Sequence, residues 1–366
     1  MTRYLLAGGG TAGHVNPLLA VADRLVERHP DAVIRVLGTV EGLESRLVPE
    51  RGYQLITVQR LPFPRRPNRA ALRFRADFSA LVAEIAAIIT EQKIDVVVGF
   101  GGYVSAPAYL AARRVGVPLV VHEANAKPGM ANRLGARFTR SVGVAFEGTR
   151  LPHATFTGMP LRREIESLDR AAVRASALSS FGLSTRRPTL LVTGGSLGAQ
   201  RINETVYAAA ASILGAGWQI LHVTGTRSAI VATELGGYVI LPYSDRMDLA
   251  IAAADLAVAR AGAATVSEFT AVGLPAVYVP LAIGNGEQRM NARGAVDAGG
   301  AITVDNADFT PEWVADQLVP LLQDRALVAD MAARSLSVGV ADGSDRVVDL
   351  IDDAVGRHEG KVGWSE

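Results

Sequence analysis

The sequence predicts an α/β protein of two domains, each a doubly wound parallel sheet with helices on both faces. A glycine-rich turn occurs twice, at residues 5–13 and 190–198, and both copies read L-L-x-x-G-G-[TS]-x-G. An apolar run that meets glycines and then a helical pattern indicates a strand turning into a helix, because glycine allows close backbone approach. Short apolar runs alternate with helical patterns in both halves, which is typical of parallel sheets. The amides at each helix start favour an anion, so we expect two similar halves facing one ligand or two.

Length and composition fit this architecture. The chain has 366 residues, of which 49% are hydrophobic, and such a length suits two domains of roughly 150 to 200 residues each. The absence of cysteine excludes disulfides and thiolate metal sites and fits a reducing compartment. Met1-Thr2-Arg3 runs directly into the first expected strand, and no apolar run approaches the ~20 residues of a membrane span. We therefore expect no signal peptide and no transmembrane helix.

The first half is expected to alternate strands with helices. Strands are expected at 3–7, 33–38, 54–58, 95–99, 118–122 and 141–146, with helices notably at 17–28, 71–92 and 107–115. The carboxyl ends of parallel strands meet at one edge of a sheet, so the loops after these strands are expected to hold the ligand.

The first glycine turn also fits G-x-G-x-x-G at residues 8–13, so a dinucleotide-binding domain has to be considered. Such a domain places an acid at the end of its second strand to bind the ribose. Here that strand ends near Thr39, and the nearest acids, Glu41 and Glu44, begin the next helix. The pattern argues against a nicotinamide site.

The stretch from Arg60 to Arg75 holds six arginines and no acid, interleaved with leucine and phenylalanine. Such a segment can lie on an anionic bilayer surface, where each cation contributes about 1 kcal/mol. The alternative is an arginine-rich solvated loop followed by an ordinary helix. A nucleic-acid site is not expected, because the rest of the chain lacks a basic face.

Two loops at the expected ligand edge carry polar groups. Residues 99–105 contain three glycines and Tyr103, which suits backbone approach to a ligand, although small residues at a helix start can also serve packing alone. The loop after the next strand places Glu123 and Asn125 at the same edge. His122, at the strand end, is expected to be a hydrogen-bonded core histidine.

The first half closes near Gly158 and Pro160, which stop regular structure. We expect the domain boundary there, giving one domain at 1–159 and another at 160–342. Arg162 is expected in the cleft between the halves, where its guanidinium fork could hold a phosphate. The alternative is a surface arginine.

The second half repeats the alternation. Strands are expected at 189–193, 219–224, 238–241, 256–259 and 276–279. The helix after the second glycine turn is expected at 199–211, with Ser196 available to a phosphate oxygen.

The densest polar loops follow the last two expected strands. Residues 259–268 run through small side chains into a helix, which puts Thr265 and Glu268 on its first turns. The Glu268 carboxylate can accept two hydrogen bonds from a ribose diol. The alternative is a helix that Thr265 caps, with Glu268 beside the positive end of the dipole. Glu287, Gln288 and Asn291 follow the next strand, and polar side chains of this kind recognise sugars.

Seven motifs carry a resemblance to a known family. They read GGGTAGH, GFGGYVSAP, HEAN, TGMPLR, TGGSLGAQRIN, RAGAATVSE and GNGEQRMNA, in this order along nearly the whole chain. The chain resembles the MurG family of glycosyltransferases, which act in bacterial peptidoglycan synthesis. The resemblance implies the GT-B fold, in which two Rossmann-like domains face an interdomain cleft. It also implies transfer of N-acetylglucosamine from UDP-N-acetylglucosamine (UDP-GlcNAc) to the muramic acid C4 hydroxyl of lipid I, inverting the anomeric centre and forming lipid II.

The same resemblance implies a task for each domain. Residues 1–159 would bind the acceptor and face the membrane, with a C-terminal helix at about 343–358 packing back on them, and residues 160–342 would bind UDP-GlcNAc. The protein would then be peripheral, on the cytoplasmic face of the cell membrane, contacting the anionic surface through the arginine-rich stretch.

The resemblance implies two overlapping sets of site residues. The donor set is Thr11, Ala12, Gly13, Asn125, Arg162, Ser196, Ala263, Ala264, Thr265, Val266, Ser267, Glu268 and Gln288. The acceptor set is Thr11, His14, Tyr103 and Glu123. Glu268 would hold the ribose and Gln288 the sugar hydroxyls, and the second glycine turn would face the diphosphate.

Three positions depart from the family pattern. Ala12 replaces a glycine, which makes backbone approach at the first turn tighter. Glu287 replaces a glutamine, and an ionised glutamate only accepts hydrogen bonds. Ser244 stands where an apolar residue often lines the uracil pocket.

The expected mechanism is a single in-line displacement at the anomeric carbon. His14 is the first candidate for the base that takes the acceptor hydroxyl proton, because neutral imidazole is available near pH 7; Glu123 is the second. Alternatively, His14 orients the glycine turn or binds pyrophosphate. No cofactor is expected, and no metal, because no D-x-D sequence occurs near the donor loops.

Two other classes of function share this scaffold. A sugar-nucleotide epimerase would need acid-base carboxylates around the sugar, for which Glu287 and Glu123 are the obvious candidates. A nucleotide-sugar sensor would bind UDP-GlcNAc without turnover. The epimerase gives the arginine-rich stretch no role, whereas a transferase with a lipid-linked acceptor does.

Overall fold

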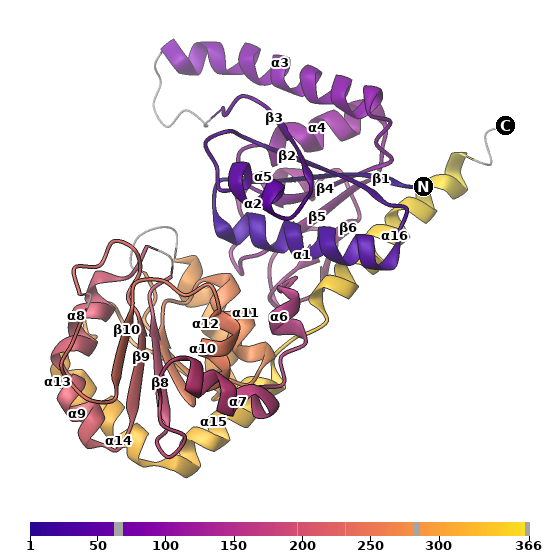
Figure 1. Cartoon of the computed structure of the whole chain (residues 1–366). Helices are drawn as coiled ribbons and strands as arrows, with labels where there is room; N and C mark the ends of the chain where they lie inside the picture. Colours follow the sequence, from indigo (N-terminus) through magenta and orange to yellow (C-terminus); the bar gives the residue numbers. More distant parts are fainter. Residues whose placement is uncertain (62–68, 196, 231, 282–285, 363–366) are drawn as a thin grey trace. The chain divides into compact units, whose positions relative to one another are not determined.

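The computed structural model describes residues 1–61, 69–195, 197–230, 232–281 and 286–362. The chain divides into two compact units. Unit 1 comprises Met1–Arg162 and Asp342–Glu366, and unit 2 comprises Arg163–Ala341. Each unit is built on one parallel sheet flanked by helices (Figure 1), which confirms the predicted α/β fold class.

The sheet of unit 1 has the strand order β3-β2-β1-β4-β5-β6-β7, and every pair is parallel. Its strands are β1 (Arg3–Gly8), β2 (Val33–Gly38), β3 (Gln54–Thr57), β4 (Val96–Gly101), β5 (Leu119–Glu123), β6 (Ser141–Val144) and β7 (Ala154–Phe156). The strand order reverses at β1, which lies between β2 and β4. In open α/β sheets a ligand binds beyond the carboxyl ends of the strands at such a reversal, which here are β1 and β4.

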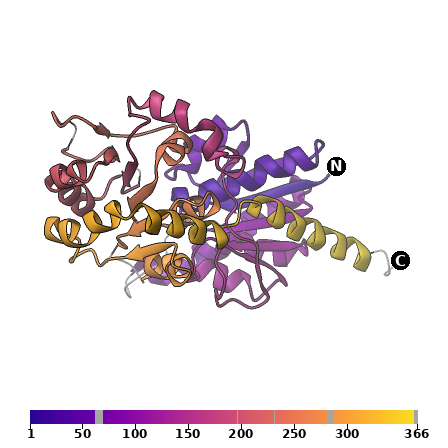
Figure 2. The same ribbon diagram turned by 90° about the horizontal axis from the view of Figure 1, so that it is seen from below.

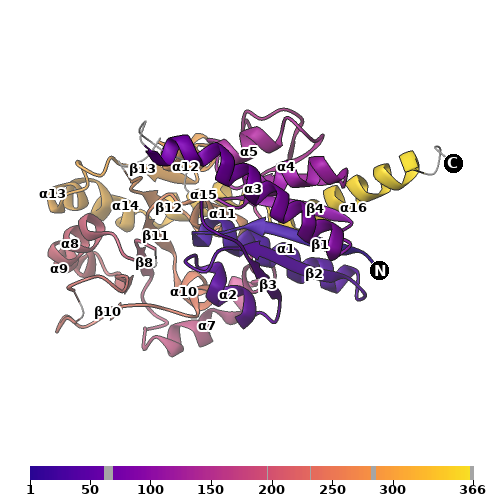
Figure 3. The same cartoon turned by 90° about the horizontal axis from the view of Figure 1, so that it is seen from above.

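Helices cover both faces of this sheet. They are α1 (Ala12–Arg28), α2 (Glu44–Glu50), α3 (Arg69–Glu91), α4 (Ser105–Val115), α5 (Met130–Gly135) and α16 (Gly343–Val362). Helices α3 and α4 lie side by side over one face (Figure 3), where Ile85 and Tyr109 pack with Val97 of β4. Helices α1 and α16 cover the other face, where Leu18 and Val347 belong to the second core of the unit.

The last helix, α16, packs along α1 and beside β5 and β6 (Figure 2). Val347, Val348 and Ile351 are fully buried there. At the rim of this contact, Arg28 forms ion pairs with Asp345 at 2.8 Å and with Asp349. The C-terminal segment is thus an integral part of unit 1.

The sheet of unit 2 has the order β10-β9-β8-β11-β12-β13, again all parallel. Its strands are β8 (Thr189–Thr193), β9 (Gln219–Val223), β10 (Tyr238–Leu241), β11 (Leu256–Ala259), β12 (Ala276–Tyr278) and β13 (Ala301–Thr303). Its helices are α6 (Arg163–Glu166), α7 (Arg170–Ser180), α8 (Gln200–Ala208), α9 (Ala210–Gly215), α10 (Met247–Ala253), α11 (Ala263–Ala271), α12 (Glu287–Asp297), α13 (Pro311–Trp313), the π-helical turn η1 (Val314–Leu318), α14 (Val319–Gln323) and α15 (Arg325–Ser337). The order reverses at β8, which lies between β9 and β11.

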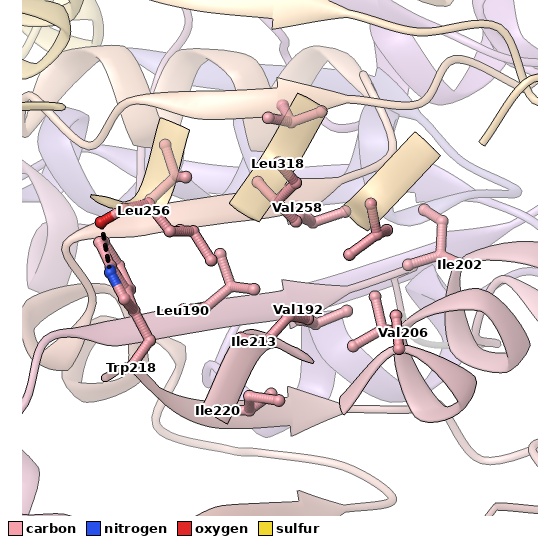
Figure 4. Close-up of a cluster of buried hydrophobic side chains, with 14 of the residues drawn as sticks. Leu190, Val192, Ile202, Val206, Ile213, Trp218, Ile220, Leu256, Val258 and Leu318 are labelled. Carbon is pink, nitrogen blue, oxygen red and sulfur yellow. Dashed lines mark hydrogen bonds between the residues drawn. The ribbon is translucent and has the colours of Figure 1, made fainter. Parts of the chain in front are cut away.

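The core of unit 2 lies between its sheet and helices α8, α9 and α14. Side chains from neighbouring strands, such as Leu190, Ile220 and Leu256, converge there (Figure 4). The buried Trp218 indole N–H donates to the Leu322 carbonyl at 2.7 Å. That bond satisfies the one polar atom of a large apolar side chain and links the residue before β9 to α14.

The expected elements differ from the structure mainly at their ends. Strands β7 and β13, both short and at sheet edges, were not expected. Helix α1 begins at Ala12 rather than at Pro17, which lies inside it. The expected helix at 199–211 is divided at Ala209, whose backbone leaves helical geometry between α8 and α9. In the part of the chain described, no helix combines the length and apolar character needed to cross a membrane.

Candidate functional site

Both glycine turns lie where the strand order reverses. The first follows β1, between β2 and β4, and the second follows β8, between β9 and β11. In open α/β sheets, ligands bind beyond the strand ends at this point. Each unit therefore has one candidate site, marked by its own turn.

In the first turn, the chain passes through positive φ at Gly10, at +89°, and then enters α1. Thr11 is the N-cap residue, and its side chain makes no capping bond. Because α1 begins at Ala12, the amides of the predicted residues Ala12 and Gly13 lie at the helix start. Such amides lack intrahelical partners and are suited to an anion.

The His14 side chain is oriented by this turn. Its Nδ1 lies 3.1 Å from the Gly9 carbonyl oxygen and 3.3 Å from the Thr11 hydroxyl. Because a carbonyl only accepts, Nδ1 carries the proton in the neutral ring, and Nε2 keeps its lone pair. A side chain at Gly101 would place its Cβ only 3.1 Å from Nε2, so the ring lies against the glycine loop after β4. This geometry leaves His14 equipped to act as a base through Nε2.

Glu123, at the end of β5, is buried with only 3% of its surface exposed. One carboxylate oxygen accepts from the Asn125 backbone N–H at 2.9 Å. The other accepts from the Gly129 N–H and the Asn132 side-chain amide, both at 2.9 Å. These bonds organise the loop after β5. Asn132, which sequence reasoning missed, stands on α5 outside the quoted motifs, and only the structure reveals its contact.

Tyr103 is exposed in the loop after β4. The guanidinium of Arg60 lies 4.7 Å from its ring centroid, a cation–π contact that joins this loop to the start of the arginine-rich stretch. His122 is buried, and its Nε2 donates to the Gly158 carbonyl at 3.1 Å. Burial lowers the pKa of His122 to about 4. The expected core role of His122 is confirmed.

The second turn is packed tightly onto the loop after β9. Gly195 and Gly198 have φ values of +86° and +85°, and a Cβ at Gly198 would lie 2.2 Å from the Thr224 carbonyl oxygen. The Asn203 amide donates to the same oxygen at 2.8 Å. The predicted Ser196 lies outside the described residues. A cavity of about 490 Å³ adjoins the turn, lined in part by Asn203 and Arg227.

Helix α11 presents part of its first turns to solvent. Gly262 is its N-cap residue, so Thr265 does not cap it, and the capping alternative for Thr265 is wrong. Of the predicted residues, Ala263, Val266 and Ser267 are buried, whereas Ala264, Thr265 and Glu268 are partly exposed. The second group is therefore the part of this set that solvent reaches.

Two residues that sequence reasoning left out of the site fix the loops around α11. Nη1 of Arg260 donates to the Val279 carbonyl at 2.9 Å, and burial lowers the pKa of Arg260. The buried Asn291 side chain donates to the Ala261 carbonyl at 3.3 Å. Their positions directly after β11 and on α12 are the signals from which these roles could have been predicted.

Gln288 lies on the first turn of α12, beside Glu287. Its side-chain oxygen accepts from the Leu281 N–H at 2.9 Å, which connects α12 to the chain just after β12. The N-cap residue Gly286 has a φ of +80°. Gln288 is therefore held at the same sheet edge as α11.

The predicted site residues fall into two groups, one at the carboxyl edge of each sheet. Unit 1 holds Thr11, Ala12, Gly13, His14, Tyr103, Glu123, Asn125 and Arg162, and unit 2 holds Ala263, Ala264, Thr265, Val266, Ser267, Glu268 and Gln288. Arg162 is the last residue of the first segment of unit 1 and is partly exposed.

In unit 1, a cavity of about 660 Å³ lies at the amino-terminal ends of β5 and β6. Arg137, Arg140 and Arg357 are among its lining residues, and none of the predicted site residues lines it. Among the described residues, no group of three or more His, Cys, Asp or Glu side chains is arranged to hold a metal ion.

Comparison with known proteins gives a consistent result over nearly the whole chain. The glycosyltransferase family 28 N-terminal domain matches residues 4–144, and the family 28 C-terminal domain matches residues 189–347. The chain is 65% identical over 351 residues to a UDP-N-acetylglucosamine--N-acetylmuramyl-(pentapeptide) pyrophosphoryl-undecaprenol N-acetylglucosamine transferase from Leifsonia xyli, with 96% of this chain and 98% of the relative covered. A protein of the same name from Paenarthrobacter aurescens is 50% identical, with 96% of each chain covered.

Among solved structures, the crystal structure of Acinetobacter baumannii MurG is similar, with a TM-score of 0.78 and 29% identity. The match covers 96% of this chain and all of that chain, 100%. It confirms the predicted GT-B architecture.

Proposed function

The chain belongs to glycosyltransferase family 28, and on that premise we propose how its residues divide the work of the transfer. It is a GT-B enzyme that moves N-acetylglucosamine from UDP-GlcNAc to lipid I and forms lipid II. The observation that carries this function is the 65% identity to such a transferase over 96% of the chain.

In the proposed division, unit 2 binds the donor. The partly exposed carboxylate of Glu268 accepts hydrogen bonds from the ribose hydroxyls, and Gln288 contacts the sugar. The second glycine turn and the start of α8 face the diphosphate, where amides without intrahelical partners stabilise negative charge. Arg162 adds a cation for the departing UDP.

Unit 1 binds the acceptor at the first glycine turn, near Tyr103. His14 takes the proton of the muramic acid C4 hydroxyl through Nε2 as the hydroxyl oxygen attacks the anomeric carbon. UDP leaves from the opposite side with the bonding electron pair, so the anomeric centre is inverted. Glu123, whose oxygens both accept hydrogen bonds from its own loop, shapes that loop and is the second candidate for the base.

The test is transfer of labelled N-acetylglucosamine to a short-chain lipid I analogue by the parent, His14→Ala and Glu268→Ala. We expect His14→Ala to lower kcat ~10²-fold or more with little change in KM, since a general base contributes ~10²- to 10⁴-fold. We expect Glu268→Ala chiefly to raise the donor KM, because a ribose contact is made in both ground and transition states. A His14→Ala enzyme with the parent kcat would remove His14 from the role of base, and Glu123→Gln would be measured next.

We also propose that the protein is peripheral at the cytoplasmic face of the cell membrane and contacts anionic lipid through the stretch from Arg60 to Arg75. Residues 62–68 of this stretch lie outside the described residues. In its described part, Arg73 and Arg75 are exposed on α3, and the ring of Phe74 stacks on Phe78 with centroids 5.5 Å apart. The cations therefore flank aromatic side chains on one helix.

Replacing Arg65, Arg66, Arg69 and Arg73 by glutamine is expected to weaken binding to anionic vesicles by up to ~10³-fold, because each lost cation near the surface removes about 1 kcal/mol. Transfer to a short-chain soluble acceptor is expected to stay near the parent rate. The matched control neutralises Arg289, Arg293, Arg325 and Arg334 of unit 2, which changes the net charge equally. Equal vesicle binding by both variants would return the stretch to the solvated-loop interpretation.

A further inference from the structure

Glu44, the first residue of α2, is a buried acid for which the proposed mechanism has no role. Only 1% of its surface is exposed. Its Oε1 accepts from the backbone N–H and the hydroxyl of Thr39, both at 2.9 Å. Its Oε2 accepts from the N–H of Gly10 at 2.8 Å. One oxygen thus anchors the carboxylate to the end of β2, and the other reaches the first glycine turn.

The turn is built around this carboxylate. A Cβ added at Gly9 or at Gly42 would lie 2.4 Å or 2.0 Å from an oxygen of Glu44. A Cβ added at Gly38 would lie 2.4 Å from its Cγ. Three backbone segments therefore approach Glu44 as closely as only glycine allows. A carboxylate buried at this depth is costly unless donors compensate it, and three donors surround this one.

The peptide group that bonds to Glu44 through its N–H also bonds to His14 through its carbonyl. The Gly10 N–H and the Gly9 carbonyl belong to one peptide plane. The N–H donates to Glu44 at 2.8 Å, and the carbonyl accepts from Nδ1 of His14 at 3.1 Å. A hydrogen bond to an anion at the N–H polarises the peptide and makes its carbonyl a better acceptor. A chain of two hydrogen bonds thus connects the Glu44 carboxylate, through the Gly9–Gly10 peptide, to the His14 imidazole.

We propose that Glu44 is a positioning residue for the transfer reaction, acting on His14 through the Gly9–Gly10 peptide. The inference rests on the proposed function, in which His14 is the base. By polarising the Gly9 carbonyl, Glu44 strengthens the bond that keeps hydrogen on Nδ1 and leaves the Nε2 lone pair for the acceptor hydroxyl. When Nε2 takes that proton, the hydroxyl oxygen bonds to the anomeric carbon, UDP departs with the bonding electrons, and the imidazole becomes a cation. The polarised Gly9 carbonyl stabilises that cation. Glu44 itself takes no proton.

Glu44→Gln tests the proposal with almost no change in shape. Thr39 and Gly10 donate to different oxygens of Glu44, and a glutamine has an acceptor oxygen at only one of these two positions, so it cannot accept from both. We expect kcat to fall ~10- to 100-fold, a part of what a general base contributes, while the KM for UDP-GlcNAc stays within about twofold. An unchanged kcat in a folded Glu44→Gln enzyme would overturn the proposal.

A double-mutant cycle with His14→Ala separates positioning from general support of the fold. If Glu44 acts through His14, its substitution costs less than about threefold in kcat once His14 is absent, because residues that act as a unit are not additive. If the two losses multiply, Glu44 only supports the structure and the proposal fails. Should His14→Ala keep the parent kcat, the base of the proposed function is wrong, and the spectroscopic measurement below still decides what Glu44 does.

That measurement is the imidazole ¹⁵N spectrum of histidine-labelled protein, with the His14 signals identified by their loss in His14→Ala. The parent is expected to show His14 with hydrogen on Nδ1, and Glu44→Gln a shift toward the other tautomer. Identical His14 spectra would contradict the proposal.

Thr39→Val is the matched control. It removes one hydrogen bond from the same carboxylate, on the oxygen that does not accept from Gly10, so we expect a comparable loss of thermal stability but a kcat within about threefold of the parent. Glu44→Asp, which keeps the charge but withdraws it from Gly10, covers the case in which Glu44→Gln does not fold. It is expected to lower kcat and to show the same lack of additivity with His14→Ala, and multiplying losses would again overturn the proposal.

Discussion

The buried residue His222 supports the second glycine turn indirectly, through Asn203. The His222 ring on β9 contacts the Tyr238 hydroxyl through Nδ1 at 2.8 Å and the Asn203 side-chain oxygen through Nε2 at 3.1 Å. Asn203 in turn donates to the Thr224 carbonyl, against which Gly198 packs. A neutral ring satisfies both contacts, with Nε2 donating and Nδ1 accepting from the tyrosine. If the ring became charged, the second proton would sit on Nδ1 and point at the Tyr238 hydroxyl, and the buried cation would have no water around it.

Burial lowers the pKa of His222 to about 4, so we expect the stability of the protein to depend on this residue in mild acid. Between about pH 6.5 and pH 4 the unfolded chain binds the proton and the folded chain does not, so the free energy of unfolding falls as the pH falls. At pH 5 the loss from one such histidine is about 2 kcal/mol. Urea unfolding at pH 7.5 and pH 5 measures it, and His222→Gln should shrink the difference between the two pH values by about that amount. An equal difference in parent and variant would contradict the assignment.

At the scale of single residues, the sequence predicted where polar residues stand on an element better than it predicted what each side chain contacts. Thr265 and Glu268 lie on the first turns of α11, as expected, because small residues before them permit the tight strand-to-helix turn. Gly262, not Thr265, forms the N-cap, since the helix starts as soon as the strand ends. Glu44 was seen only as an acid that opens a helix. Its inward direction depends on Gly38 and Gly42 just before it and on Gly9 of the first glycine turn, and the approach to Gly9 is a distant contact that no local pattern reveals.

Helix α16 shows the limit of local patterns at the scale of elements. The sequence pattern indicates that one face of this helix is apolar, but the sheet that this face covers begins more than 300 residues earlier. The pairing of Arg28 with Asp345 and Asp349 is likewise a contact between distant segments. By contrast, β2, β8, β10 and β11 match their expected bounds, because short apolar runs flanked by polar or glycine residues define buried parallel strands locally.

The buried face of α16 is expected to contribute strongly to unit 1. Ile351→Ala should lower the free energy of unfolding by about 2–5 kcal/mol, as for other large aliphatic side chains removed from a core. Leu336→Ala on α15, where 55% of the leucine is exposed, serves as the control and should change it by less than about 0.5 kcal/mol. Denaturant unfolding of both variants gives the comparison. Equal, small effects would mean that α16 only lies on the surface of unit 1.

At the scale of the whole molecule, the repeated turn made the two-sheet architecture predictable, since each copy requires its own strand, helix and sheet. The residues that belong to each unit were harder to predict from the sequence. Unit 1 is discontinuous in sequence, with its last helix following all of unit 2. Nothing in the pattern near residue 342 indicates to which sheet the following helix belongs, because an amphipathic helix fits either.

Removing residues 342–366 is therefore expected to damage the two units unequally. Unit 1 loses the buried side chains of Val347, Val348 and Ile351, each contributing about 1.5–3 kcal/mol, which together approach the whole stability of an ordinary domain. Amide hydrogen exchange should show lost protection in β1 and β4 and retained protection in β8 and β11. UDP-GlcNAc binding by calorimetry should stay within about threefold of the parent if unit 2 holds the donor. Full protection of β1 in the shortened chain would contradict this account.

The return of α16 to unit 1 also sets an order of events during protein synthesis. When the ribosome has made residue 341, unit 2 has every strand and helix it needs, whereas unit 1 still lacks the side chains that close one of its cores. The part of unit 1 that is made first therefore stays incompletely buried until α16 has been synthesised. The later-made unit is thus the first that can finish folding, and a nascent chain stalled before α16 would present the apolar face of α1 to chaperones.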